Sequence, residues 1–338
     1  MFKIDIHTHI LPGNLNKLTE TFSDPRFLQL DKLDEQNAIL KKDQQSFRKV
    51  GCNCWHAPER IKDCNKTDVD MQVLSTIPVL FSYWADDAEC LKLSQFLNDH
   101  ISHIVQENPE YFLGLGTIPM QNADLAIEEM DRCVNELKFP GIEIGSNVNG
   151  KNLSEEAFHS IFKHAEKIGC SIFVHPWEMM GQSDMKKYWL PWLVGMPAET
   201  SRAICSIMFG GILDKYPALK IAFAHGGGAF PFTIGRIEHG FNVRPDLCAI
   251  DNERLPSSYL EHIYVDSLVH DEKAMSFLID ILGENQIALG SDYPFPLGEH
   301  LPGKLIEDMN LSDSTKQRLL AGTALEWLGL DQSEFIRN

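Results

Sequence analysis

The sequence predicts an α/β protein folded as a (β/α)₈ TIM barrel, with a small lobe inserted after the first strand. Two observations predict this class. The chain carries eight short apolar segments, and most of the gaps between them show the periodicity of amphipathic helices. Strands that are apolar throughout suit a parallel sheet buried on both faces, and regular alternation with helices suits a closed barrel. A doubly wound open sheet is the alternative that the same pattern allows.

The eight expected strands are apolar runs that each end in turn or polar residues. Helices are expected between them at Asp86–Glu107, Leu125–Leu137 and Glu155–Ile168, where apolar side chains recur at helical spacing. In chain order the strands are Lys3–His7, Met71–Ser75, Phe112–Thr117, Gly141–Ile144, Ser171–His175, Lys220–His225, Ile263–Ser267 and Ile287–Ser291.

Two connections are longer than a simple crossover needs. The stretch from Ile10 to Asp70 separates the first two strands, and residues 13–60 are expected to form a lobe over the barrel mouth. The stretch from Pro176 to Leu219 follows the fifth strand, and its front half is rich in aromatic residues. It should cover the same mouth, because loops that follow strands lie at the C-terminal face of a barrel. We therefore expect one domain over residues 1–338.

The charge balance excludes some partners. The formal net charge is −18 at pH 7, whereas nucleic acid and anionic membranes both need a basic face. No run of about 18 apolar residues is present, so no membrane span is expected. The first ten residues lack the apolar core and cleavage site of a signal peptide, so we expect a cytosolic protein whose eight cysteines are thiols.

Metal-capable side chains stand at the ends of four predicted strands. His7 and His9 end the first strand, and residues at i and i+2 of a strand face the same way. His175 closes the fifth strand, His225 closes the sixth, and Asp292 follows the eighth. If the barrel forms, all five side chains converge at its C-terminal face.

A set of three histidines and one carboxylate suits a single zinc ion, with cobalt, iron or manganese as alternatives. The set is His7, His9, His175 and Asp292. Such an ion makes bound water more acidic or polarises a carbonyl group. His225 is then available as a general acid and base. The alternative is that His225 is the fourth metal ligand, and that Asp292 does not bind the metal but supports one of the ligands.

Other motifs carry weaker signals. Gly226–Gly228 fits no phosphate-binding frame, so these glycines are expected to let the backbone crowd the site. Arg48 in the insertion and Arg236 after the sixth strand are candidates to bind carboxylates. One group of cysteines and a histidine in the insertion has two interpretations. A structural zinc site is one, although the spacing fits no standard ribbon or finger, and reduced thiols are the simpler one. The group consists of Cys52, Cys54, His56 and Cys64.

Four sequence blocks resemble the 2-amino-3-carboxymuconate-6-semialdehyde decarboxylase family of the amidohydrolase superfamily. The resemblance extends from Ile4 to Leu330, and the aromatic block after His175 is its most specific part. The paired histidines and a late aspartate alone would indicate only the superfamily. The blocks are Val174–Met180 (VHPWEMM), Tyr188–Thr200 (YWLPWLVGMPAET), Phe223–Phe232 (FAHGGGAFPF) and Leu289–Glu299 (LGSDYPFPLGE).

The resemblance implies an oxygen-independent decarboxylase that acts on 2-amino-3-carboxymuconate 6-semialdehyde in tryptophan catabolism, the kynurenine pathway. It would thereby limit the synthesis of quinolinate and NAD. The resemblance also implies one zinc ion per subunit, His225 as the acid–base residue beside the catalytic Asp292, and Arg48 as a substrate-binding arginine. It implies a homodimer in which Arg236 reaches the neighbouring active site. Four further residues fall on pocket positions, namely Lys41, Met179, Trp192 and Phe295.

The chain also departs from the family's pattern. His56 and the run Asp63-Cys64-Asn65 differ from the residues usual there, which puts the local helix packing in doubt more than the chemistry. Glu143 in the fourth predicted strand stands where an uncharged residue is common. It could touch the site or merely pair with a neighbour.

Three rival functions fit parts of the pattern. One is a hydrolase that cleaves an amide or lactone on the same barrel, although no lysine ends the fourth strand, where binuclear members of the superfamily place a carboxylated one. Another is a related decarboxylase of aromatic acids. The third is a metal-bound sensor, for which the spare histidine His225 has little use.

Overall fold

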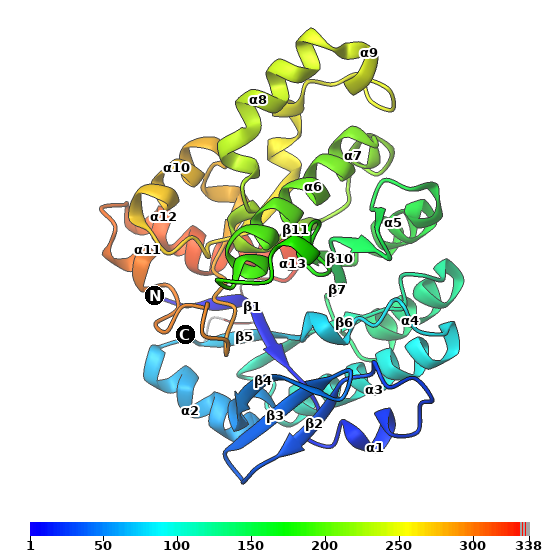
Figure 1. Cartoon of the computed structure of the whole chain (residues 1–338). Coiled ribbons are helices and arrows are strands. Elements are labelled where there is room, and N and C mark those ends of the chain that lie inside the picture. The colour runs from blue at the N-terminus through cyan, green and yellow to red at the C-terminus, as the bar shows by residue number, and fades with distance from the viewer. Residues whose placement is uncertain (332, 334, 336–338) are drawn as a thin grey trace.

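Eight parallel strands form the centre of the protein in the computed structural model, which describes residues 1–331, 333 and 335. They pair in the order β1-β5-β6-β7-β10-β11-β12-β13, and Figure 1 labels the strands of this series from β1 to β11. Their bounds are β1 Ile4–Ile10, β5 Met71–Thr76, β6 Phe112–Thr117, β7 Gly141–Gly145, β10 Ser171–His175, β11 Ile221–Phe223, β12 Ile263–Asp266 and β13 Ile287–Ala288. The predicted fold class is confirmed.

The first strand closes the ring against the segment that follows β13. The amide of Ile6 donates to the carbonyl of Leu289 at 2.9 Å, and the amide of His9 donates to the carbonyl of Tyr293 at 2.8 Å. Thr8 also forms a parallel bridge with Tyr293. A doubly wound open sheet would leave β1 as an unpaired edge, so that alternative is wrong.

A bulge in β1 turns its two histidines into the barrel. Ile4 and Ile6 pack in the interior core, so strict alternation would point His7 outward. The register of β1 on β5 shifts between residues 5 and 8, and Ile6 and His7 together face the single residue Val73. The extra residue brings His7 and His9 to the inner side, where they share one face.

The long helices pack around the barrel. Helix α4 begins two residues before the predicted start, because the side chain of Asn122 accepts a hydrogen bond from the amide of Leu125 and caps the helix there. None of the described helices is long and apolar enough to cross a bilayer. The bounds are α3 Asp87–Glu107, α4 Ala123–Asn135, α5 Glu156–Ile168, α6 Met196–Phe209, α8 Phe230–Val243 and α10 Glu272–Leu282.

Shorter elements complete the chain. Two single-turn π-helices, Pro191–Gly195 and Arg318–Gly322, precede α6 and α13. The remaining helices are α1 Asn16–Thr19, α2 Ala57–Thr67, α7 Ile212–Lys215, α9 Pro245–Cys248, α11 Lys304–Asp308, α12 Asp313–Gln317 and α13 Thr323–Leu328, and a two-stranded ribbon joins β8 Asn147–Val148 to β9 Lys151–Asn152.

The long insertion after β1 folds into a three-stranded antiparallel sheet of β2 (Gln29–Lys32), β3 (Asn37–Lys42) and β4 (Gln45–Gly51). Its apolar side chains form one cluster with those of α3 and with Phe295 beyond β13. In Figure 1 this sheet lies on the opposite side of the barrel from α8 and α9. Helix α2 continues past residue 60, and the division into one domain with a lobe at residues 13–60 stays a prediction.

Candidate metal centre and active site

Four donor side chains meet at the C-terminal end of the barrel. Nε2 of His7 lies 3.1 Å from Nε2 of His9 and 3.6 Å from Oδ1 of Asp292. The same Asp292 oxygen lies 3.2 Å from Nε2 of His9. His175 supplies the fourth donor, and all four atoms lie within 4.8 Å of one another. The strand-end histidines and the aspartate are therefore brought together as the spacing predicted.

The donor atoms fit a divalent cation. Each histidine directs its Nδ1 to an acceptor behind it. For His7 this is Asp266 at 2.6 Å, for His9 the carbonyl of Thr76 at 2.8 Å, and for His175 the carbonyl of Pro176 at 3.0 Å. The Nε2 lone pairs then face one another, which is unfavourable unless a proton or cation sits between them. Two ligands on one tetrahedral zinc lie about 3.4 Å apart, given bonds of about 2.0–2.1 Å.

His225 lies beside this group and is not one of the four donors. Its ring centroid is 5.2 Å from that of His7 and 5.1 Å from that of His175. Its Nδ1 is buried and has no hydrogen-bond partner among the residues that the structure describes. His225 adopts a left-handed backbone with φ 59°, and Gly226 and Gly227 continue the left-handed turn. The three-glycine run thus shapes the backbone at the site, as expected from its small side chains.

Burial controls the charges in the cluster. Burial and the neighbouring His7 lower the pKa of His225 to about 4. Burial, followed by the other histidines, holds the pKa of His175 well below its ordinary value. Neutral imidazole is the form that binds metals and accepts protons. Burial alone would raise the pKa of Asp292, but its hydrogen bond with His9 and the nearby charges lower it, so this carboxylate stays ionised.

Two buried side chains that support the site were missed from the sequence. Asp266, the last residue of β12, contacts His7 and the backbone of His225. Arg60 of α2 is fully buried, donates to the carbonyl of His9 at 2.7 Å, and lies 4.7 Å from the ring centroid of Tyr293. Asp266 was detectable as a charged residue at the end of a predicted strand. Arg60 carried no such signal, because it lies in the insertion.

Glu143 points into the barrel beneath the metal-binding group. It is fully buried, and among the described residues neither carboxylate oxygen forms a hydrogen bond of good geometry, although the Ser75 hydroxyl lies close enough to lower its pKa. One oxygen lies 3.8 Å from Nδ1 of His9. Burial raises the pKa of Glu143 to about 8, and the charge of His9 opposes this shift. Glu143 therefore stands next to the site rather than pairing elsewhere.

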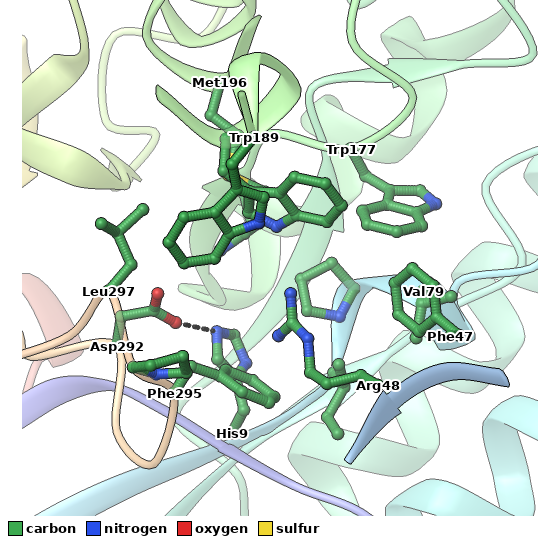
Figure 2. Close-up of a pocket in the computed structure, with 15 residues that line it drawn as sticks. His9, Phe47, Arg48, Val79, Trp177, Trp189, Met196, Asp292, Phe295 and Leu297 are labelled. Carbon is green, nitrogen blue, oxygen red and sulfur yellow. Dashed lines mark ion pairs between the residues drawn. The ribbon is translucent and has the colours of Figure 1, made fainter. Parts of the chain in front are cut away.

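A cavity opens directly above the donors, and like most small-molecule sites it combines apolar walls with a few polar groups. His9, His175 and Asp292 form its floor. Aromatic and aliphatic side chains form its wall, and Figure 2 shows the guanidinium of Arg48 reaching in among them from β4. The wall residues include Phe47, Trp177, Trp189, Trp192, Met196 and Phe295.

Arg48 is the cation in this cavity. Its guanidinium carbon lies 4.7 Å from the ring centroid of Phe295 and 5.6 Å from that of Trp192. Burial lowers the pKa of Arg48, and the charge of Asp292 opposes this shift. Within the described part of the chain Arg48 makes no ion pair, so its charge is available to a ligand. Three of the expected pocket residues, Arg48, Trp192 and Phe295, therefore line one cavity.

The other expected pocket residues lie elsewhere. Lys41 forms an ion pair with Asp31 in the insertion sheet and does not line the cavity. Met179 is buried beneath Gly195, outside the lining. Arg236 is exposed on α8, away from the cavity of its own chain. The binding roles of these residues stay predictions.

The cysteines of the insertion form no second metal site among the described residues, where only one group of donors could hold an ion. The Cys52 thiol donates to the side chain of Gln36 at 2.9 Å. Burial raises the pKa of Cys54 and of Cys64 to about 12, so both are neutral thiols. The simpler interpretation of this motif, reduced thiols, agrees with the geometry.

Known proteins resemble this chain along its whole length. Residues 4–330 match the amidohydrolase family. The chain is 54% identical over 335 residues to 2-amino-3-carboxymuconate-6-semialdehyde decarboxylase of Dictyostelium discoideum, covering 99% of this chain and 93% of the relative. It is 38% identical over 382 residues to the Caenorhabditis elegans protein of the same name, covering 98% and 95%.

A solved structure shares the fold. It is the 5-carboxyvanillate decarboxylase of Novosphingobium aromaticivorans, complexed with manganese and 4-hydroxy-3-methoxy-5-nitrobenzoic acid. It superposes with a TM-score of 0.80 at 23% identity, covering 97% of this chain and 96% of the other. At this identity the likeness establishes the common barrel.

Proposed function

Because the chain belongs to the amidohydrolase family and, within it, to the 2-amino-3-carboxymuconate-6-semialdehyde decarboxylases, we propose that it is a carboxy-lyase for that substrate. The reaction releases one carboxyl group as CO₂, without oxygen, and leaves 2-aminomuconate 6-semialdehyde. The observation that carries the proposal is the cavity in which Arg48 faces the donor group of His9, His175 and Asp292. A dicarboxylate needs such a cation beside the reacting centre.

We propose one zinc ion per subunit, held by His7, His9, His175 and Asp292. Three imidazoles and one carboxylate within 4.8 Å of one another support a cation, and nitrogen and oxygen donors in this number suit zinc. A bound divalent ion acts as a Lewis acid and makes water at the site more acidic. Manganese is the specific competitor, because it is the ion in the 5-carboxyvanillate decarboxylase structure.

The protein's own residues orient the substrate and move a proton. Arg48 binds a carboxylate of the substrate, and the aromatic wall excludes water around the conjugated chain. Breaking the carbon–carboxylate bond leaves its electron pair on carbon, and that carbon must receive a proton. His225 is buried, its pKa is lowered, and it lies beside His7 and His175, so a ring nitrogen can take a proton from water at the site and pass it to that carbon.

We further propose a homodimer in which Arg236 completes the neighbouring active site. Support comes from α8, where Phe232 is 82% exposed one turn before the exposed Arg236, and from α9, where Leu247 is 57% exposed. Apolar patches of this kind are unfavourable in water unless a partner covers them.

Mixing two inactive variants tests the dimer. A heterodimer of His225→Ala and Arg236→Ala contains one intact site, because the subunit with His225 receives Arg236 from its partner. Activity should return on mixing. Activity that stays absent in a mixture shown to contain heterodimers would contradict the proposal.

We place the reaction in the cytosol, in tryptophan catabolism through kynurenine, where it limits quinolinate and NAD synthesis. The substrate class supports this role, since removal of the carboxylate precludes its cyclisation to a pyridine dicarboxylate. Cells that lack the protein should accumulate quinolinate, which mass spectrometry would measure.

The decisive experiment follows the near-ultraviolet absorbance of the substrate and the release of CO₂. The purified protein should consume the semialdehyde with one CO₂ per turnover, lose activity in chelator and regain it with zinc. A hydrolase of the same barrel would instead add water to an amide or lactone and release no CO₂. A zinc-loaded protein that leaves the semialdehyde unchanged would overturn the proposal and favour a metal-bound sensor.

A further inference from the structure

Asp266 stands behind the metal-binding group and accepts four hydrogen bonds. Its side chain is fully buried at the end of β12. Nδ1 of His7 lies 2.6 Å from one carboxylate oxygen, and the amide of His225 donates to the same oxygen at 2.8 Å. The other oxygen accepts the amides of Gly226 at 2.7 Å and Leu268 at 3.1 Å. One carboxylate thus contacts both a metal-ligand candidate and the acid–base candidate.

The first of these contacts fixes the tautomer of His7. An ionised carboxylate only accepts hydrogen bonds, so Nδ1 of His7 must carry the proton and Nε2 presents its lone pair to the other donors. His9 and His175 obtain the same tautomer from main-chain carbonyls. His7 alone has a carboxylate at hydrogen-bond distance behind it, which also makes its Nε2 a stronger donor.

The second contact holds the backbone that carries His225. His225 and Gly226 are consecutive left-handed residues, and that conformation is disfavoured for a residue with a side chain. Their adjacent amides both point at Asp266, an arrangement that binds anions. A side chain at Gly226 would lie 2.5 Å from Val269, so the turn is also packed tightly against the segment after β12. The turn sets the His225 ring beside His7 and His175.

We propose that Asp266 is a positioning residue that couples the metal ligand His7 to the acid–base residue His225. It keeps the proton of His7 on Nδ1, away from the metal. It also holds the backbone of His225 in the left-handed conformation, which is disfavoured without this contact. The part of this inference that concerns His225 rests on the proposed function. The part that concerns His7 rests on metal binding alone and has its own readout.

The test uses Asp266→Asn in the full-length protein. The substituted amide keeps the size of the side chain but presents an NH₂ group to donors that need an acceptor. Chelator-stripped protein, shown to be folded by circular dichroism, is titrated with zinc against a competing indicator. We expect affinity to fall by about 10- to 100-fold. At saturating zinc we expect kcat to fall further while KM changes little, because Arg48 and the cavity wall stay in place.

A matched control removes another buried carboxylate far from the site. Glu129 of α4 is 1% exposed and is bonded to Asn98 and Arg132. Glu129→Gln should lower the melting temperature and leave zinc affinity and kcat unchanged. The visible bands of the cobalt-substituted protein give a second readout, since they change with ligand geometry. They should shift in Asp266→Asn and not in Glu129→Gln.

The outcomes separate the two claims. Asp266→Asn that melts earlier but binds zinc and turns over like the wild type would overturn the inference, because Asp266 would then be only a buried structural acid. Weakened zinc binding in Asp266→Asn, together with a wild type that decarboxylates nothing, would overturn the proposed function and still support the coupling to His7.

Discussion

The metal-binding floor of the cavity and its aromatic rim are built in different ways. The floor comprises the cavity-lining residues His9, His175 and Asp292 together with the adjacent His7. These residues stand at or just after strand ends and are at most 9% exposed. The rim comes from the insertion sheet, from the loop after β10 and from the segment after β13, and Trp189 in the loop after β10 is 41% exposed. The rim residues are Phe47, Arg48, Trp177, Trp189, Trp192 and Phe295.

The two regions are also held by different forces. Directed hydrogen bonds to Asp266, Thr76 and Pro176 fix each histidine of the floor. Rim side chains meet through ring contacts, such as the 6.5 Å between the centroids of Phe47 and Trp192, and through Arg48 packed on those rings. We therefore expect changes in the floor to abolish chemistry and changes in the rim to shift substrate binding.

The largest effect is expected from Asp292→Ala. Substituting a residue that only supports a metal ligand typically lowers metal affinity by about 10- to 100-fold. Removing a ligand itself should lower the affinity further. The variant should contain little zinc by elemental analysis and show no measurable turnover. A metal-replete Asp292→Ala with substantial activity would contradict the four-ligand assignment and favour His225 as a ligand.

His225→Ala should keep its metal and lose its chemistry. Loss of one acid–base group typically costs about 10²–10⁴ in rate. We expect kcat to fall in this range with zinc content and melting temperature near those of the wild type. A turnover close to normal would remove His225 from the mechanism. Comparison with Asp292→Ala then separates metal binding from proton transfer within the floor.

The floor was predictable from the sequence because strand geometry places its residues. Alternation put His7 and His9 on one face, and the barrel topology brought His175 and Asp292 to the same end. The sequence did not predict the bulge opposite Val73, which decides that this face is the inner one. Bulges arise from packing across two strands and leave no mark in the sequence of one.

The rim was only partly predictable, because its positions depend on how an insertion folds onto the barrel. Trp192 and Phe295 were expected in the cavity through resemblance alone, and Arg48 was also a candidate as a charged residue of the insertion; all three line the cavity. Lys41 was expected there and instead pairs with Asp31. The register of β3 on β4 shifts between residues 40 and 41, so counting along the strand cannot identify which lysine faces the cavity.

Arg48→Met should weaken substrate binding more than catalysis. Hydrogen bonds to a charged group contribute about 1.5–3 kcal/mol, which corresponds to about 10- to 100-fold in kcat/KM. Most of the loss should appear in KM, with zinc content unchanged. Arg48→Lys should recover only part of it, since an ammonium group cannot bind a carboxylate through two parallel bonds. An unchanged KM in Arg48→Met would place the carboxylate elsewhere.

The smallest effect is expected at Lys42, which neighbours Lys41 in the insertion sheet. Nζ of Lys42 lies 5.4 Å from the ring centroid of Trp177, a cavity residue, whereas Lys41 is engaged by Asp31. A partly exposed cation near the entrance helps to attract an anion to a protein of net charge −18, and the effect is screened by salt.

Lys42→Met should raise KM by about 2- to 5-fold at low ionic strength, a contribution of about 0.5–1 kcal/mol. The difference should disappear at high salt, and Lys41→Met, the matched control, should leave KM unchanged at both. The reverse result would mean that the register shift between β3 and β4 turns Lys41 toward the substrate when the cavity is filled.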